Sequence, residues 1–438
     1  MGVISLQDYL NDLLILGNMC LNHCEYEAAM TYFEVALKII HSGDANDALG
    51  KAKLYLLVGT THKCKGNFEQ AKNYHTHALD IHLKQLGPEH VHVATSYNNL
   101  ASYNNLGTVY SDLGDFQKAK ENHARAPDIY LKQLGPEHVD VAASYNNLGD
   151  FQKAKDYHAR ALDIRLRHIG PWHMDVATSY NNLGNVYSGL GDFLQAKDCL
   201  ARTLDIRLKQ LGPKHVAVAT SYNNLSTVYR NLAWVLYSDL GDFQQAKYYL
   251  TRALDIRLKQ LGPEHVDVAA SYNDLGTVYS DLGDFQRAKD NHARALEIYP
   301  KQLGPEHVDV AASYNNLGTV FSDLGDFQKA KDYHARALDI RVKQLGPKHI
   351  DVAASYNNLG TVYRNLSDLQ KAKHNHVRAL DIRVKQLGPE HVGVAASYNN
   401  LGTVYSDLGC FQKAKDNYAR APSETAWIRA WKCRIFLQ

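Results

Sequence analysis

The sequence lacks the features that mark secreted and membrane proteins. Its six cysteines are scattered irregularly over 438 residues, so they form no disulfide framework, and a reducing compartment is the simplest expectation. No run of 18 consecutive apolar residues occurs, so no membrane-spanning segment is expected. The opening residues MGVISLQDYL lack the basic stretch and apolar core of a secretory signal. We therefore expect a cytoplasmic protein that does not act on a membrane.

The sequence also lacks an excess of charge of either sign. Its 48 Lys and Arg residues are balanced by 46 Asp and Glu residues, and this net charge of +2 gives no electrostatic reason to expect nucleic acid as a partner. The sequence contains no phosphate-binding loop of the form G-x-x-x-x-G-K-[ST], no nucleophile elbow and no metalloprotease motif. We expect no catalytic residues and no cofactor, and hence a protein that is not an enzyme.

One group of potential metal ligands needs weighing, namely Cys20, His23 and Cys24 together with His62 and Cys64. Cys20 and Cys24 share a helical face, so a zinc site is conceivable on geometry alone. The spacing matches no established zinc pattern, and we interpret these residues as ordinary core and surface residues. No metal site is predicted.

What the sequence has in abundance is internal repetition. Ten copies follow one another, most at a spacing of 42 residues, which is the pattern of a repeat architecture. The copies are aligned on a Leu-Gly pair or its substitute, whose second residue we count as position 8. This residue is, in chain order, Gly17, Gly59, Gly107, Gly149, Gly184, Ser226, Gly276, Gly318, Gly360 and Gly402. The predicted units lie near 10–51, 52–93, 94–138, 139–173, 174–215, 216–265, 266–307, 308–349, 350–391 and 392–420, with irregularities at 96–107, 139–160 and 227–241. Residues 421–438 are expected to form a tail or a capping helix.

Each copy has the apolar pattern of two helices joined by a turn. In the copy that begins at Val308, an apolar stripe at helical spacing predicts a first helix, and Gly325 and Asp326 predict its end and the next start. A second stripe follows, and Gly346 with the next Pro ends it. The first stripe is Tyr314, Leu317, Gly318 and Phe321, and the second is Phe327, Ala330, His334, Ala337, Leu338 and Ile340.

The pattern Tyr-x-x-Leu-Gly-x-x-aromatic, followed by Ala and by a second Ala seven places later, resembles the tetratricopeptide repeat. The 42-residue length, the segments ALDI and LGPEH and the Asn pair of the first helix are similar to the repeats of kinesin light chains and nephrocystin-3. The resemblance implies an all-α fold, a right-handed α-solenoid of about ten helical hairpins. It also implies a protein-protein interaction scaffold that binds an extended peptide or a partner segment in its concave groove.

The Asn pair of the first helix is the candidate binding device. When the repeated Gly of a copy is counted as position 8, positions 5, 9 and 12 lie opposite the core stripe, on the helix face that would line the groove. An Asn side chain both donates and accepts, so a row of them can pair with the main chain of a peptide of any sequence. The predicted groove residues are Asn104, Asn181, Asn223, Asn273, Asn315, Asn316, Thr319, Asn357, Asn358, Thr361, Asn399, Asn400 and Thr403.

Two alternatives stay open. The asparagines could bond to neighbouring helices or to water, in a purely structural or self-associating array. The chain could also be an RNA-binding helical repeat, although its predicted groove has almost no Arg or Lys apart from Arg230 and Arg364, and phosphate binding needs positive charge. The sequence identifies no particular protein partner.

The histidines fall into two series. One lies in the GPEH turns, and the other, which includes His75 and His334, takes a second-helix position that Leu200 and Tyr418 fill in other copies. We predict that the second series packs in the core. A half-buried His could also make the array sensitive to acid.

Three copies are irregular. The doubled hexapeptide SYNNLASYNNLG places six extra residues in the third copy, and we expect Tyr103 and Leu106 of the second hexapeptide to hold the core positions. A deletion after Gly149 should distort the fourth copy, either by shortening its first helix or by fusing its two helices locally. An insertion at 227–241 should lengthen that of the sixth copy and requires cover for Trp234.

Overall fold

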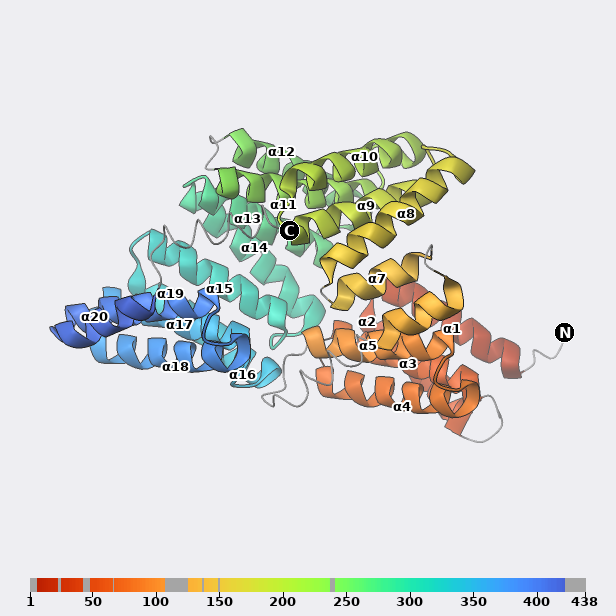
Figure 1. The fold of residues 1–438 in the computed structure, drawn as a ribbon, viewed down its shortest axis with the longest axis horizontal. Helices are drawn as coiled ribbons and strands as arrows, with labels where there is room; N and C mark the ends of the chain where they lie inside the picture. Colours follow the sequence, from red (N-terminus) through yellow and green to blue (C-terminus); the bar gives the residue numbers. More distant parts are fainter. Residues whose placement is uncertain are drawn as a thin grey trace. The chain divides into compact units, whose positions relative to one another are not determined.

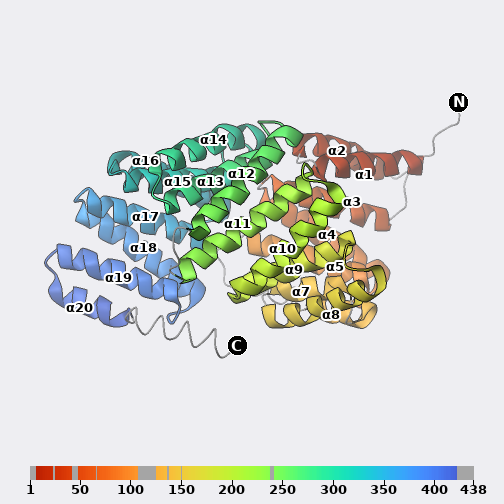
Figure 2. The same ribbon diagram turned by 90° about the horizontal axis from the view of Figure 1, so that it is seen from above.

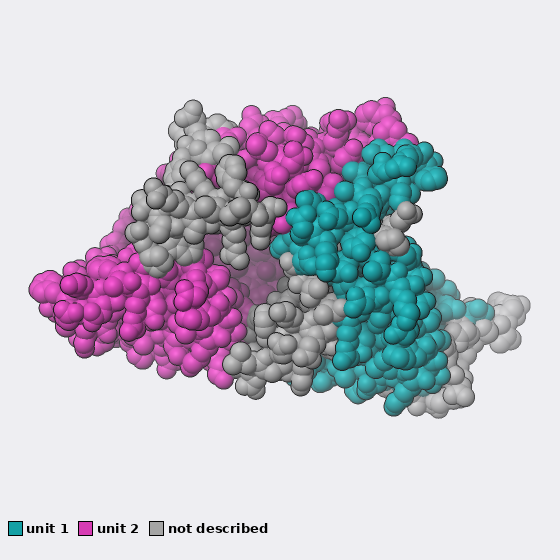
Figure 3. All heavy atoms as spheres, in the orientation of Figure 1, with its two compact units in different colours: residues 1–107, 112–168 teal, residues 108–111, 169–438 magenta. Residues whose placement is uncertain are grey.

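A computed structural model describes residues 6–22, 25–41, 48–65, 67–106, 125–135, 138–148, 150–236 and 241–421. Within these ranges the chain forms helices and no strand, as the sequence predicts for an all-α solenoid. The chain divides into two compact units, one made of the described residues up to His168 and one made of those from Ile169 onward (Figures 1 and 3). No helix within the described ranges is both long and apolar enough to cross a membrane.

The first unit contains helices that pair in sequence order. They are α1 (Leu6–Asn22), α2 (Tyr26–His41), α3 (Ala48–Cys64), α4 (Phe68–Leu86), α5 (Val91–Leu106), α7 (Val139–Leu148) and α8 (Phe151–Ile169). Residues 125–134 are helical as well.

The second unit consists of six successive hairpins (Figure 2). In each hairpin the first helix is called the A helix and the second the B helix. The pairs are α9 (Met174–Leu190) with α10 (Phe193–Leu211), α11 (Val216–Leu236) with α12 (Gly241–Leu261), α13 (Val266–Asp281) with α14 (Phe285–Leu303), α15 (Val308–Asp323) with α16 (Phe327–Leu345), α17 (Ile350–Asn365) with α18 (Leu369–Leu387), and α19 (Val392–Asp407) with α20 (Phe411–Arg420).

The helix ends follow from local chemistry. Gly325 has a φ of 80°, which only Gly adopts without strain, and it lets the chain turn from α15 into α16. Oδ1 of Asp326 then accepts a hydrogen bond of 3.2 Å from the backbone N–H of Lys329 and caps α16. Capping of the A helices had not been predicted. Nδ1 of His307 accepts from the backbone N–H of Asp309 at 3.1 Å, and the same bond is made by His90, His138, His173, His215, His265, His349 and His391.

The two helices of a hairpin approach closely at the repeated Gly. A Cβ atom added to Gly318 would lie 2.8 Å from the imidazole of His334, and Gly360 and His376 have the same relation. His75, His158, His292, His334 and His376 are all buried, which confirms the predicted packing role for these five, while His123 of the same series lies outside the described residues. Leu200, Phe33 and Tyr418 occupy the equivalent place against Gly184, Gly17 and Gly402.

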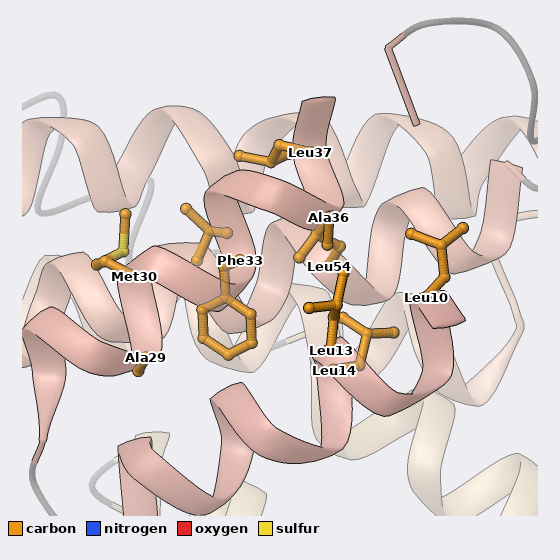
Figure 4. Packing of buried hydrophobic residues seen from close by; sticks show 10 residues of the cluster. Leu10, Leu13, Leu14, Ala29, Met30, Phe33, Ala36, Leu37 and Leu54 are labelled. Carbon is orange, nitrogen blue, oxygen red and sulfur yellow. The ribbon is translucent and has the colours of Figure 1, made fainter. Parts of the chain in front are cut away.

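The core of the first hairpin has the same arrangement, with a Phe in the place of the His. Phe33 of α2 is fully buried against Gly17, and Leu10 and Leu13 of α1 belong to the same buried cluster (Figure 4). Leu54 of α3 joins this cluster, so the core runs continuously from the first hairpin into the second. Burial of each such side chain contributes about 1.5–3 kcal/mol.

Helix α5 runs through both hexapeptides and ends at Leu106 in the described part, and its buried residues include one that was expected to lie off the core. Tyr97 of the first hexapeptide is buried, with 7% of its surface exposed, so the expectation that the first hexapeptide stays off the core is wrong. The reason is that the register is counted from the cap at His90, which places Val93, Ala94 and Tyr97 as in the regular copies. The side chains of Tyr103 and Leu106, and that of Asn104, lie outside the described part.

The other two irregular copies also differ in their A helices. The deletion leaves α7 with ten residues, so the predicted shortening is confirmed. The insertion lengthens α11 to 21 residues, also as predicted. Trp234 at the end of α11 lies edge-on to Phe243 with its ring centroid 5.9 Å away, but 58% of its surface is exposed. The expectation that Trp234 finds cover is therefore wrong. The predicted tail, beyond Ala421, falls outside the described residues.

Candidate functional site

The Asn pairs of the second unit connect successive A helices. In each pair, Nδ2 of the second Asn donates to Oδ1 of the first Asn of the preceding copy, and we call this series of bonds the asparagine ladder. Its four rungs are Asn224 to Asn181 at 3.0 Å, Asn316 to Asn273 at 3.1 Å, Asn358 to Asn315 at 3.0 Å, and Asn400 to Asn357 at 2.8 Å. The asparagines thus bond to neighbouring helices, which was one of the alternative interpretations of the pairs.

The rungs use only half of the hydrogen-bonding capacity of the first Asn. Oδ1 of Asn315 accepts from Asn358, and Nδ2 of Asn315 makes no hydrogen bond to the part of the chain that is described. Asn357 is in the same situation. Both side chains are half-buried, so their amide groups remain partly open to solvent. Each rung therefore holds a carbonyl oxygen in place and leaves two N–H donors for another group.

The threonines one turn further along belong to the same face. The hydroxyl of Thr319 donates to the backbone carbonyl of Asn315 at 3.2 Å, and Thr361 and Thr403 repeat the bond to Asn357 and Asn399. Because the hydroxyl hydrogen is used within the helix, the oxygen faces outward as an acceptor. Thr319 and Thr361 are exposed. Amide donors and hydroxyl acceptors therefore alternate along the A helices.

One rung carries a carboxylate. Asp274 stands where the other copies have the second Asn, and it is hydrogen-bonded to the side chain of Asn223. Burial raises the pKa of Asp274, while Asn223, Arg257 and Arg230 oppose that rise. Oδ1 of Asn223 is buried and has no partner among the described residues. The Asn223 amide is thus already engaged by Asp274, unlike that of Asn315.

The two arginines of the predicted groove are neutralised. Arg230 of α11 forms an ion pair with Asp281 of α13, and Arg364 of α17 forms one with Asp407 of α19. Each pair connects neighbouring A helices in the same direction. The A-helix face around the ladder therefore presents dipoles rather than a net positive charge.

The ladder positions are apolar in the first two hairpins. In the first hairpin, counted from Gly17, the places of the Asn pair are taken by Leu14 and Ile15. In the second hairpin, counted from Gly59, they are taken by Leu56 and Leu57. Two hollows of about 440 Å³ and 380 Å³ open onto these side chains, and Asn11 and Lys53 border both. Sequence reasoning missed this difference, although the replacement of Asn by Leu was visible in the alignment of the copies.

A second set of contacts between hairpins was also missed. Nη1 of Arg341 on α16 donates to Oγ of Ser355 at 2.7 Å and to the backbone carbonyl of Asp351 at 3.3 Å, both on α17. The same brace occurs at Arg207, Arg257 and Arg383. The repeated Arg after ALDI and the repeated Ser before Tyr were the available signal. This contact fixes each B helix to the next A helix.

No group of three potential metal ligands comes together within the described ranges, and His23 and Cys24 lie outside them.

Comparison with known proteins gives one family. Profiles of the tetratricopeptide repeat match residues 50–103, 101–167, 148–209, 175–233, 227–301 and 351–421, and a second profile of the same repeat matches residues 310–351. No curated protein matches the chain.

Several solved structures are similar. BtubC (BKLC) from P. vanneervenii has 26% identity over 56% of this chain and 90% of its own, with a TM-score of 0.43. A putative kinesin light chain from Podosopora anserina with nearly identical TPR-like repeats has 25% identity over 49% of this chain and 98% of its own, with a TM-score of 0.41. Because the profile matches cover most of the chain, the protein belongs to the tetratricopeptide repeat family, whose members generally mediate protein-protein interactions.

Proposed function

We propose that the second unit binds a protein partner by holding an extended segment of it along the A helices. The observation that carries the proposal is the unused amide of Asn315 and of Asn357, each held by its rung, half-buried and one turn before a Thr hydroxyl. These groups pair with the carbonyl and N–H groups that every peptide main chain offers. The first two hairpins have Leu or Ile at these positions, and the side chains of the Asn pairs at 104–105 and 146–147 lie outside the described part, so the proposal is confined to the second unit.

The spacing of the rungs supports a main-chain mode of binding. Packed helices lie about 8–10 Å apart, and an extended peptide advances about 3.3 Å per residue. A peptide that crosses the A helices would therefore meet one rung about every third residue. Such a contact set tolerates many side chains, and three or four rungs span a segment of about ten residues.

The test uses a change that keeps the rungs. Asn315, Asn357 and Asn399 are replaced together by Asp, which retains the oxygen that accepts from the next Asn and removes the two amide donors. Peptides selected on the wild-type protein from a random 12-residue library are measured by fluorescence anisotropy. We expect affinity to fall at least about tenfold, because three hydrogen bonds of about 1 kcal/mol each are lost.

A matched control carries the same change of charge elsewhere. Gln328, Gln370 and Gln412 are exposed on B helices, and their joint replacement by Glu should leave peptide affinity unchanged. If both triple variants bind the selected peptides as well as wild type does, the ladder serves only to join the helices, and the array is structural.

A further inference from the structure

The turns between hairpins show a repeated Glu-Lys pairing that is replaced in some of the turns. In the GPEH turns, the Glu pairs with a Lys near the end of the following B helix: Glu89 with Lys132 at 2.6 Å, Glu264 with Lys301 at 3.1 Å, and Glu306 with Lys343 at 3.4 Å. In one turn Trp172 replaces the Glu, and Nζ of Lys209 lies 3.7 Å from its ring centroid. The turn residue therefore normally offers an electron-rich partner to this Lys.

Lys214 reverses the charge at this position. The Lys at the end of the following B helix is Lys259, so two lysines take the places of a Glu-Lys pair. Nζ of Lys259 turns to Asp255 of its own helix, at 2.7 Å. Lys214 is exposed, and no hydrogen bond or ion pair to the described part of the chain engages it.

A hollow of about 250 Å³ lies at this turn. Lys214, Lys259 and Arg252 line it together with one acid, Asp255, so its charged groups have an excess of two positive charges. Tyr222 and Ile256 provide less polar walls. The lining comes from the turn before α11, from α11 and from α12, all within the second unit.

The position of Arg252 differs from that of its counterparts. Nη1 of Arg336 and Nη1 of Arg378 donate to the hydroxyls of Tyr314 and Tyr356, at 3.0 Å and 3.2 Å. Arg252 is bonded instead to the side chain of Tyr248, and its guanidinium lies 5.5 Å from the centroid of that ring. Tyr248 is an aromatic residue where the regular copy has Asp332, and it draws the guanidinium away from Tyr222.

We propose that this hollow is a binding site for an oxyanion, a phosphate or carboxylate group, held between Lys214, Lys259 and Arg252. A planar guanidinium and two ammonium groups together supply the donors that such an anion takes. The site is separate from the asparagine ladder and does not depend on the peptide-binding proposal.

The test is the rate at which lysines react with an acylating reagent, read by mass spectrometry, in inorganic phosphate and in chloride of equal ionic strength. Phosphate should slow labelling of Lys214 and Lys259 at least about threefold, because a bound anion masks both amines and raises their pKa. Lys348 and Lys385 are the internal control: they too replace a Glu-Lys pair, but Arg378 remains bonded to Tyr356. A parallel series in acetate separates a site for carboxylates from one for phosphate.

Two charge reversals complete the test. K214E restores the regular Glu-Lys pair and should abolish the protection of Lys259 by phosphate, whereas K348E should leave it intact. Both residues are exposed in the turns between hairpins. A melting curve checks that both variants fold. Equal protection of all four lysines, or protection of none in either anion, would overturn the proposal.

Discussion

At the scale of single residues, the contact between the repeated Gly and the side chain opposite it controls how closely a hairpin packs. Gly318 has no space for a methyl group, because its Cβ would lie 2.8 Å from the ring of His334. The imidazole cannot retreat, since His334 is itself buried on all sides.

Gly318→Ala should therefore lower the free energy of unfolding by about 1–3 kcal/mol, in spite of the better helix propensity of Ala. Urea unfolding followed by circular dichroism measures it. Gly318→Ala should cost less stability when it is introduced into the His334→Ala variant than when it is introduced into the wild type, because the smaller side chain leaves room for the new methyl group. A stability equal to wild type in Gly318→Ala would show that the helices separate without cost.

The buried histidines should make the protein sensitive to acid. Burial lowers the pKa of His75, His158, His292, His334 and His376 to about 4. In the unfolded chain a His has a pKa near 6.5, so the unfolded state binds more protons between these values. The stability present above about pH 6.5 should thus be lost as the pH falls toward 4, by up to about 3 kcal/mol for each His.

Urea midpoints at pH 7.5, 5.5 and 4.5 test this expectation. The control is His334→Leu, which copies the Leu200 of another hairpin and should show a shallower loss. A midpoint that stays constant between pH 7.5 and 5.5 would contradict a buried neutral state of these rings.

At the scale of the helix, the ladder joins A helices whose backbone hydrogen bonds are already made within each helix. Each rung crosses from one A helix to the next, and the Arg-Ser brace crosses from a B helix to the following A helix. The interface between hairpins thus depends on polar side chains as well as on apolar contact.

Asn358→Ala should cost about 1–2 kcal/mol, because Oδ1 of Asn315 is left half-buried without its donor. A double-mutant cycle with Asn315→Ala isolates the rung, and we expect a coupling energy of about 1 kcal/mol. Thr361→Ala, on the same helix but outside the rung, should show no coupling to Asn315. A coupling near zero for Asn358 would mean that water replaces the rung.

At the scale of the whole molecule, packing connects helices that are close in sequence. Within the second unit each helix contacts the next, and consecutive A helices also meet. The free energy of unfolding of such an array is approximately the sum of the stability of each hairpin and of the interaction energy at each interface between neighbouring hairpins. A local defect should therefore spread only to adjacent hairpins.

Gly360→Ala offers a test by hydrogen exchange and mass spectrometry. Faster exchange is expected in α17 and α18 and, more weakly, in α15, α16, α19 and α20, because they share interfaces with the altered hairpin. Exchange in α9 and α10 should stay at the wild-type rate. Uniform acceleration across the second unit would show a single cooperative core instead.

Much of the fold could be predicted from the sequence. The spacing of apolar residues determined the hairpins, and the Gly and Asp of each turn determined where the helices end, because these effects act within one or two turns of chain. The placement of His334 in the core followed from comparison between copies, since Leu200 and Tyr418 fill the same place.

The tertiary structure decided what depends on distances between copies. The first of the two hexapeptides is in register with the cap at His90, because a helix keeps its phase from its start. The Asn pairs could be predicted as polar, but only the packing of neighbouring A helices shows that one amide bonds across while the other stays available. Periodicity along one helix fixes the face of a residue, whereas its partner depends on the separation of two helices.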